Sequence, residues 1–432
     1  MRDRGRSASD ADLARVAHVL RRTSFGPFPG GVEEALRVAG SPDGVLERAL
    51  LAEPVPFVPP VDIDRPFDVG DVKVLGAPSL VAWWLDRMCS DDAGLHEKMM
   101  WFWHGHFTTN ASKASFLYLW HQLRTFHTHA LGNFRDLTKA MVVDPAMLMW
   151  LDGADSKIEA PNENLGRELM ELFTLGIGHY TEDDVRAAAR GLSGWGIDDQ
   201  HSVARFTPSM GPSKPDLFLG RTAVYSPDRI VDQILAQPSA APFIVSKLWA
   251  FLIGGPKDGD LIARWGDQFR SGDYEIAPVV QTMLRSDAFR AAAGSRVRSS
   301  IEWVPPVLRV LGVDTGRFNG AEISGLGQTP YDPPNVAGWS DQSTWVSSAS
   351  VFARAEFIAR TSDPSRPGRT LPELGGGDDV VEAALRLASL YDVASSTRQG
   401  LKGLASTLDG DTTQRSLAVV RATLMTPEFA LA

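Results

Sequence analysis

Apolar residues recur at helical spacing along most of this chain. Within residues 9–22 they fall on one face of a helix, at Leu13, Val16, Ala17 and Leu20, in the i, i+3, i+4, i+7 pattern of an amphipathic helix. The same pattern predicts helices near 31–39, 79–90, 94–104, 114–130, 133–143, 162–175, 181–192, 227–236, 240–253, 275–285, 350–361, 379–390 and 412–425. We therefore expect a mainly α, multi-helical globular fold.

Strand patterns are sparse by comparison. Residues 202–207 are followed by a polar loop that contains Pro and Gly, and then by residues 216–220. Such an arrangement predicts that the two stretches pair across the loop. We expect at most a small β-hairpin near 202–220.

The length of 432 residues allows two or three domains at about 150 residues each. Helical folds of this length can also share one core. We expect residues 1–200 to form an N-terminal helical part that carries the candidate site. Residues 201–432 are expected to form a C-terminal helical part packed on it, with one continuous core.

The charge balance and the single cysteine exclude several classes of protein. There are 43 Lys and Arg against 53 Asp and Glu, and the net charge is -10, so we expect no nucleic acid as main partner. No stretch of ~18 uncharged apolar residues occurs, so we expect no membrane span. Cys89 alone cannot form an intramolecular disulfide. The first residues are charged and no apolar run follows them, so the chain as given is expected to be cytoplasmic.

Two histidines, His104 and His106, end an aromatic segment at residues 97–107. They are candidate metal ligands or proton carriers. On a continuous helix they would point in opposite directions, so they converge only if Gly105 ends the helix. The alternative is a buried aromatic helix end whose imidazoles bond to backbone groups.

A polar stripe follows in residues 161–173, where Glu168 and Glu171 lie one helical turn apart. Paired carboxylates of this kind bind metals in helical bundles, usually with His from a facing helix. We assign Glu168 and Glu171 as ligand and general base, and Arg167 and Asn164 as groups that orient a substrate. The alternative is a solvated face with an Arg167–Glu171 pair.

A third group contains Arg124 and His129, as a candidate substrate-binding residue and a candidate catalytic residue. A lone histidine near a helix end is more often structural. Asp144 stands before Pro145, which predicts a helix cap. The chain contains no Gly-rich phosphate loop, no Gly-x-Ser-x-Gly elbow and no metal-binding Cys pair.

These motifs together resemble a bacterial family filed as domain of unknown function 1800. The Trp-His-x-His-Phe and Asn-Glu-Asn-x-x-Arg-Glu-Leu-Met-Glu-Leu segments are its most specific features here. The matching segments are 20–26, 97–107, 129–134, 144–148, 161–176, 180–185, 191–195, 243–251 and 333–339. The resemblance implies a predominantly helical fold but no activity. Relatives often look exported, and are often encoded beside proteins that resemble alkaline phosphatases and sulfatases.

Two functions from different classes follow. The first is a metal-assisted or acid/base enzyme with a His/Glu/Arg cluster and a divalent metal ion as cofactor. The second is a non-catalytic binding or assembly partner of another protein, for example one encoded by a neighbouring gene, with residues 331–339 as a candidate contact. A haem site, with His104 and a nearby Met99 or Met100, is a third possibility.

Overall fold

Helices make up most of the regular structure, as predicted. The computed structural model describes residues 9–58, 77–198, 202–315, 320–339, 342–365, 374, 379–408 and 412–432. The first helices are α1 (Asp10–Thr23), α2 (Gly31–Ala39), α3 (Pro42–Leu50), α4 (Ala77–Cys89), α5 (Leu95–His106), α6 (Phe116–His129), α7 (Phe134–Met141), α8 (Pro145–Trp150), α9 (Glu163–Glu171) and α10 (Glu182–Gly191). The mainly α fold is therefore confirmed.

The later helices complete the fold. They are α11 (Pro227–Leu235), α12 (Ala240–Leu248), α13 (Gly259–Ser271), α14 (Ile276–Leu284), α15 (Asp287–Ala291), α16 (Ser300–Val310), α17 (Ser348–Thr361), α18 (Val380–Leu387), α19 (Ser395–Thr407), α20 (Thr412–Leu424) and α21 (Pro427–Ala430). Shorter helical turns are η2 (Pro208–Met210), η3 (Trp249–Ile253), η5 (Gly320–Leu326) and η6 (Gln342–Val346). Of these, η3 is a π-helix that continues directly from α12.

Short polar side chains fix where many of these helices begin. The Ser9 hydroxyl accepts the Asp12 N–H at the start of α1, and Asp144 accepts the Met147 N–H at the start of α8. At α10, Thr181 forms a capping box with Asp184. Each cap satisfies a backbone donor that the first turn leaves free.

Within the described ranges the β structure consists of two small hairpins, and the predicted pairing of 202–207 with 216–220 is wrong. Strand β2 (Val203–Phe206) pairs antiparallel with β1 (Trp195–Asp198), which precedes it in the chain. Strand β3 (Asp216–Phe218) pairs with β4 (Arg221–Ala223). Each strand therefore pairs with its nearest neighbour in sequence, which closes a shorter loop.

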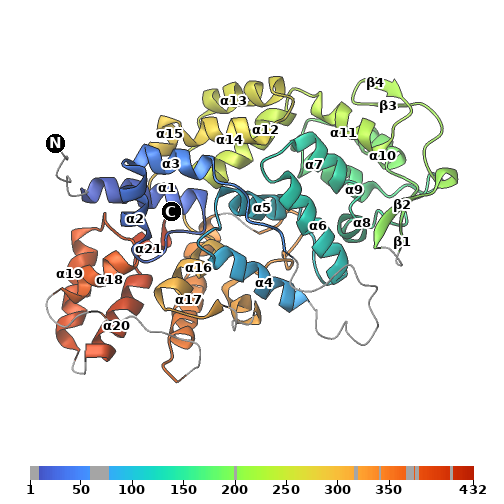
Figure 1. The fold of residues 1–432 in the computed structure, drawn as a ribbon. Helices are drawn as coiled ribbons and strands as arrows, with labels where there is room; N and C mark the ends of the chain where they lie inside the picture. The colour runs from blue at the N-terminus through green and yellow to red at the C-terminus, as the bar shows by residue number, and fades with distance from the viewer. Residues whose placement is uncertain are drawn as a thin grey trace.

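The two ends of the described chain meet at one end of the molecule. In Figure 1, α1 to α3 and α18 to α20 lie together at one end, and α8 to α11 lie at the other with both hairpins. The Arg21 Nη2 donates to the Ser389 carbonyl at 2.6 Å, and the Arg22 Nη2 donates to the Ala432 carbonyl at 2.8 Å. The buried apolar side chains form one connected cluster that extends from Leu13 to Phe429.

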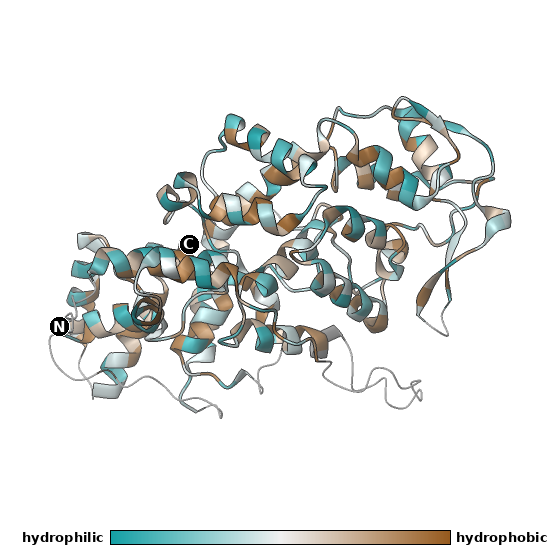
Figure 2. Ribbon diagram, turned by 45° about the horizontal axis from the view of Figure 1, so that its top comes forward, coloured by the Kyte–Doolittle hydropathy of each residue, from teal (hydrophilic) through white to brown (hydrophobic). Residues whose placement is uncertain are grey.

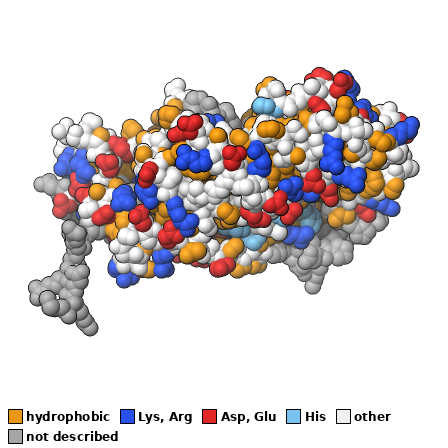
Figure 3. Space-filling model, turned by 90° about the horizontal axis from the view of Figure 1, so that it is seen from above, with side chains coloured by type: hydrophobic (Ala, Val, Ile, Leu, Met, Phe, Trp, Pro, Cys, Tyr) orange, Lys and Arg blue, Asp and Glu red, His pale blue; other side chains and the backbone are white. Residues whose placement is uncertain are grey.

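Most helices divide into apolar and polar faces, as the hydropathy colouring in Figure 2 shows. On the face seen in Figure 3, basic and acidic side chains are interspersed. Among the helices that the structure describes, none is both long enough and apolar enough to cross a bilayer.

Candidate functional site

Helix α5 lies in the core and buries ten of its 12 residues. Charged side chains in such a helix require partners, because burying an unpaired charge is costly. The Glu97 carboxylate accepts from Trp84 Nε1 at 2.7 Å and from Arg87 Nη2 at 2.7 Å. The Lys98 Nζ lies 2.5 Å from Glu302 Oε1 of α16. Ion pairs thus fix α5 against two other helices.

Gly105 does not end α5, so the condition under which His104 and His106 would converge is not met. The helix continues through His106, and the Phe107 N–H donates to the Trp103 carbonyl at 2.8 Å. Residues two apart on a helix point about 200° apart. The ring contacts agree, because no aromatic residue in the described ranges contacts both imidazoles.

His104 is sealed inside the aromatic core. Its Nε2 accepts the Tyr331 N–H at 3.0 Å, so the ring proton is on Nδ1. That Nδ1 has no hydrogen-bond partner. Burial lowers the pKa of His104 to about 3, which keeps the ring neutral. This geometry matches the alternative expectation for His104, a buried aromatic helix end whose imidazole bonds to a backbone group.

His106 has the opposite tautomer. Its Nε2–H donates to the Phe173 carbonyl at 2.9 Å, which leaves a lone pair on Nδ1. The Nδ1 atom has no partner. Burial, together with the positive charge of Lys247, holds the pKa of His106 well below its ordinary value. His106 is therefore a neutral acceptor.

Beside His106 lies a cavity of about 320 Å³, which we call the tryptophan pocket. Its wall comes from α5, from α12 and η3, from the start of α16, and from the long segment before α17. The lining residues are Trp101, Phe102, Gly105, His106, Lys247, Ala250, Phe251, Arg296, Val297, Ser299, Glu302, Gln328, Ala337, Trp339 and Trp345. Small-molecule sites in proteins are typically concave and mostly apolar, with volumes of about 300–1,000 Å³, and this cavity falls within that description.

Three segments that carry the family resemblance meet at the tryptophan pocket: 97–107, 243–251 and 333–339. The last segment approaches α5 closely. Gly338 has a φ of +84°, and a Cβ there would lie 3.0 Å from the Gly105 carbonyl oxygen. Both features favour glycine at 338. A Cβ on Gly105 would meet no atom within 4 Å, so that position borders open space.

A buried carboxylate with two cations forms one side of the pocket. The Arg296 Nη1 donates to Glu302 Oε2 at 2.7 Å, and Nη2 donates to Oε1. Lys98 bonds to the same Oε1. Burial would raise the pKa of Glu302, but the charges of Arg296 and Lys98 outweigh it and hold the pKa well below its ordinary value.

The local charge is positive, because a third buried cation lies nearby. Arg22 is fully buried and repels Arg296 electrostatically. One buried polar atom on the pocket wall also lacks a partner: the Arg296 Nε makes no hydrogen bond. Buried polar groups are seldom left unpaired.

Lys247 is the least compensated charge of the pocket. Its Nζ lies 5.0 Å from the centre of the Phe243 ring. In the part of the chain that the structure describes, the ammonium makes no salt bridge or hydrogen bond. Burial, and then the charge of Lys257, lower the pKa of Lys247 to about 8. The cation is thus destabilised and lacks a counter-ion.

The polar stripe of α9 lies outside this pocket. The Tyr180 hydroxyl donates to Glu171 Oε2 at 2.5 Å. Burial, and then the charge of Glu171, raise the pKa of the half-buried Glu168. Neither carboxylate contacts His104 or His106. The two segments meet instead at Phe173, just after α9, through its carbonyl and the His106 ring.

The other predicted residues of α9 have structural partners. Both terminal nitrogens of Arg167 donate to Glu182, each at 2.7 Å, and one also reaches Glu163 at 3.3 Å. This is not the alternative Arg167–Glu171 pair. The Asn164 Nδ2 donates to the Leu151 carbonyl at 3.3 Å.

Arg124 and His129 lie on α6. Arg124 is exposed, and burial lowers the pKa of the half-buried His129. Neither residue lines the tryptophan pocket. Within the described ranges, no group of three or more His, Cys, Asp or Glu is placed to hold a metal ion. The catalytic, substrate-binding and metal-ligand roles of the eight residues remain predictions.

Sequence reasoning found His106 but missed Lys247, Arg296 and Glu302. A signal for them exists, since Lys247 and Glu302 each interrupt an apolar helical stretch. Charges in such stretches point to buried partners or to sites. Trp339 was identified only as part of the 333–339 family segment and of a possible partner contact.

Of the comparisons with known proteins, the one with protein families gives a match. A family described as "Protein of unknown function (DUF1800)" matches residues 18–431. No curated protein and no solved structure matches the chain. Because the match covers nearly the whole sequence, the chain belongs to the DUF1800 family.

Proposed function

We propose that the tryptophan pocket binds a small organic anion, which Lys247 holds by charge. The observation that carries this proposal is the uncompensated ammonium of Lys247, half-buried at a pocket whose other two charged residues, Arg296 and Glu302, pair with each other. An anionic group would remove the electrostatic cost of that ammonium and form a charge-assisted hydrogen bond. The unpaired Arg296 Nε and the hydroxyl of Ser299 offer two further donors to the same group.

The apolar residues of the pocket wall indicate the chemical nature of the rest of the ligand. Trp101, Trp339 and Trp345 present flat apolar surfaces, which suit a planar or aromatic body. The volume of about 320 Å³ lies at the lower end of small-molecule sites. An aromatic carboxylate fits both the walls and the charge.

The test is isothermal titration of the full chain with benzoate, and with benzyl alcohol as the uncharged counterpart. We expect benzoate to bind and to quench tryptophan fluorescence. Lys247→Met should weaken benzoate binding at least ~10-fold, since charge-assisted hydrogen bonds contribute about 1.5–3 kcal/mol. Lys402→Met, which removes an exposed lysine on α19, is the matched control and should leave binding unchanged.

Two outcomes would overturn the proposal. In the first, benzoate binds no better than benzyl alcohol. In the second, Lys402→Met weakens binding as much as Lys247→Met, which would indicate only a general effect of net charge. Circular dichroism and melting temperature of each variant establish that it is folded.

Acid/base chemistry on the bound molecule is the second candidate function. It is favoured by the pKa of Lys247 near 8, which leaves part of the amine unprotonated at mildly alkaline pH. General bases work best when their pKa lies near the working pH. The lone pair on His106 Nδ1 is a second acceptor at the pocket.

A further inference from the structure

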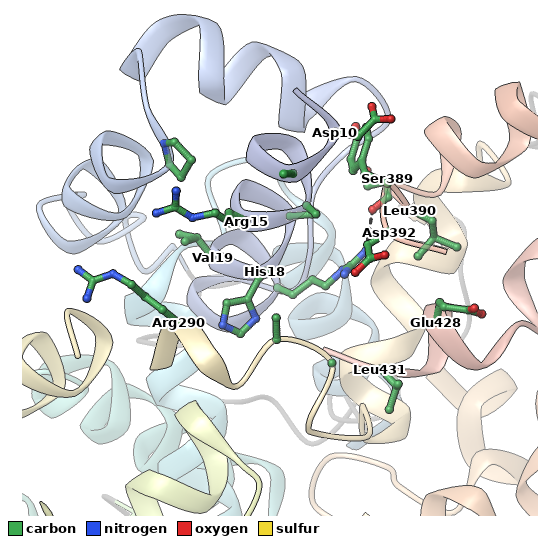
Figure 4. A pocket seen from close by; sticks show the side chains of 18 of the residues that line it. Asp10, Arg15, His18, Val19, Arg290, Ser389, Leu390, Asp392, Glu428 and Leu431 are labelled. Atoms are coloured by element: carbon green, nitrogen blue, oxygen red, sulfur yellow. Dashed lines mark hydrogen bonds between the residues drawn. The ribbon is translucent and has the colours of Figure 1, made fainter. Parts of the chain in front are cut away.

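A second and larger cavity lies away from the tryptophan pocket. Its volume is about 670 Å³. It is formed where α1 meets α15, the turn after α18, and α21 (Figure 4). The proposed function makes no use of it.

His18 of α1 forms part of the wall of this cavity. Its Nε2–H donates to the Phe289 carbonyl at 2.9 Å, and the ring packs on the Phe289 ring with centroids 4.6 Å apart. The Nδ1 lone pair is therefore free, and it has no partner. Only 5% of His18 is exposed. Burial and the charge of Arg22 lower its pKa to about 3, so Nδ1 remains an acceptor.

The basic residues on one side of the cavity are already paired. Arg15 lies 3.5 Å from Asp43, and Arg290 donates to Asp287 at 2.8 Å. Figure 4 shows both arginines on one side of His18. Their charges are therefore largely cancelled by neighbouring carboxylates.

The other side of the cavity is acidic and largely unpaired. In Figure 4, Asp10, Asp392 and Glu428 lie on the far side of His18 from the two arginines. Asp10 and Asp392 form no ion pair with any residue that the structure describes. Glu428 Oε1 accepts the Ala394 N–H at 3.1 Å, but its buried Oε2 has no partner. Two cations lie nearby: Arg21 donates to the Ser389 carbonyl, and Arg398, which interacts electrostatically with Asp10, pairs with Glu382.

We propose that this cavity binds an aliphatic amine, with the ammonium against Asp392 and Glu428. An ammonium carries three donors and no acceptor. It therefore complements the two carboxylates, and a donor group of the same ligand complements His18 Nδ1. Ala14, Ala17 and Leu431 also line the cavity and provide apolar surface for a methylene chain.

The experiment is calorimetric titration of the full chain with 1,5-diaminopentane, and with pentane-1,5-diol as the uncharged counterpart. We expect the diamine to bind and the diol not to bind. Asp392→Asn and Glu428→Gln should each weaken diamine binding about tenfold. Both are close in shape to the original residue, and the glutamine retains an oxygen for the Ala394 N–H.

Asp92→Asn is the matched control, because Asp92 is exposed and does not line this cavity. It should not change diamine binding. The His18 Nδ1 resonance, followed by ¹⁵N NMR, should shift when diamine is added. Binding of the diamine to an acidic surface away from His18 would not shift this resonance.

The proposal is overturned if the diol binds as well as the diamine, or if Asp92→Asn weakens binding as much as Asp392→Asn. It is also overturned if Mg²⁺ displaces the diamine at equal concentration, which would indicate simple attraction of cations. Lys247→Met should leave diamine binding intact, so failure of the anion proposal and failure of this one are distinguishable.

Discussion

At the scale of single residues, Asp144 shows how burial alters a carboxylic acid. Its side chain caps α8, as its place before Pro145 predicts, by accepting the Met147 N–H at 2.9 Å. It also accepts from Gln122 Nε2 at 2.8 Å. Burial nevertheless raises its pKa from 3.8 to about 7, and these hydrogen bonds offset only part of the effect.

This pKa predicts a specific pH dependence of stability. Because the folded protein holds the proton more tightly than the unfolded chain, the contribution of Asp144 is largest below pH 3.8 and is lost as pH rises to about 7. One pKa unit corresponds to about 1.4 kcal/mol, so the loss is a few kcal/mol. Asp144→Asn cannot ionise, and its free energy of unfolding should fall less than that of the wild type between pH 5 and pH 8. Urea unfolding at both pH values measures this, and parallel curves would contradict it.

At the scale of elements, the position of the 333–339 loop on α5 depends on Gly338. Its positive φ disfavours any other residue, and a Cβ would also press on the Gly105 carbonyl oxygen. Gly30 has a φ of +73° with no atom within 4 Å of a Cβ. A comparison of substitutions at the two positions therefore separates the cost of backbone strain from the cost of steric crowding.

Gly30→Ala should lower the free energy of unfolding by about 1 kcal/mol, the cost of a left-handed backbone. Gly338→Ala should cost at least ~1 kcal/mol more, because crowding in a packed region adds to that strain. It should also weaken benzoate binding, since Ala337 and Trp339 line the pocket. Equal losses in the two variants, measured by urea unfolding, would show that the loop adjusts freely.

Some of these elements could be predicted and others could not. Helical periodicity identified α1, α5 and α9. Helix α16 was missed because Pro305 and Pro306 lie inside it, and proline normally breaks a helix. It persists because its residues are almost all buried, so packing outweighs local preference. The hairpin partners were wrong because strand propensity says little about which segment pairs with which.

The residues of the tryptophan pocket could also be predicted only in part, because tertiary packing brings them together. His106 stood out within an aromatic motif, whereas Lys247 and Arg296 lie in segments far from it in sequence. Their role depends on the tertiary fold, which places α12 and the segment before α16 at the same pocket as α5. Glu168 and Glu171 formed the more conspicuous pattern, but Tyr180 and not an imidazole lies against Glu171.

At the scale of the whole molecule, one apolar cluster connects the two halves of the sequence. Long-range contacts reinforce it, since Arg285 donates to Glu47 at 2.7 and 2.8 Å. A shared core favours cooperative unfolding. We expect a single calorimetric transition whose calorimetric and van't Hoff enthalpies agree. Two separable transitions would instead support independent domains at about 1–200 and 201–432.

The cysteine content has a practical consequence. Cys89 is 7% exposed, and burial raises its pKa to about 12, so its thiol is unreactive under ordinary labelling conditions. A side chain at position 105 meets open space, so Gly105→Cys would introduce the only thiol that a labelling reagent can reach. A fluorophore attached there would report directly on whether the neighbouring hollow is filled, which makes this chain suitable for screening compound libraries by emission alone.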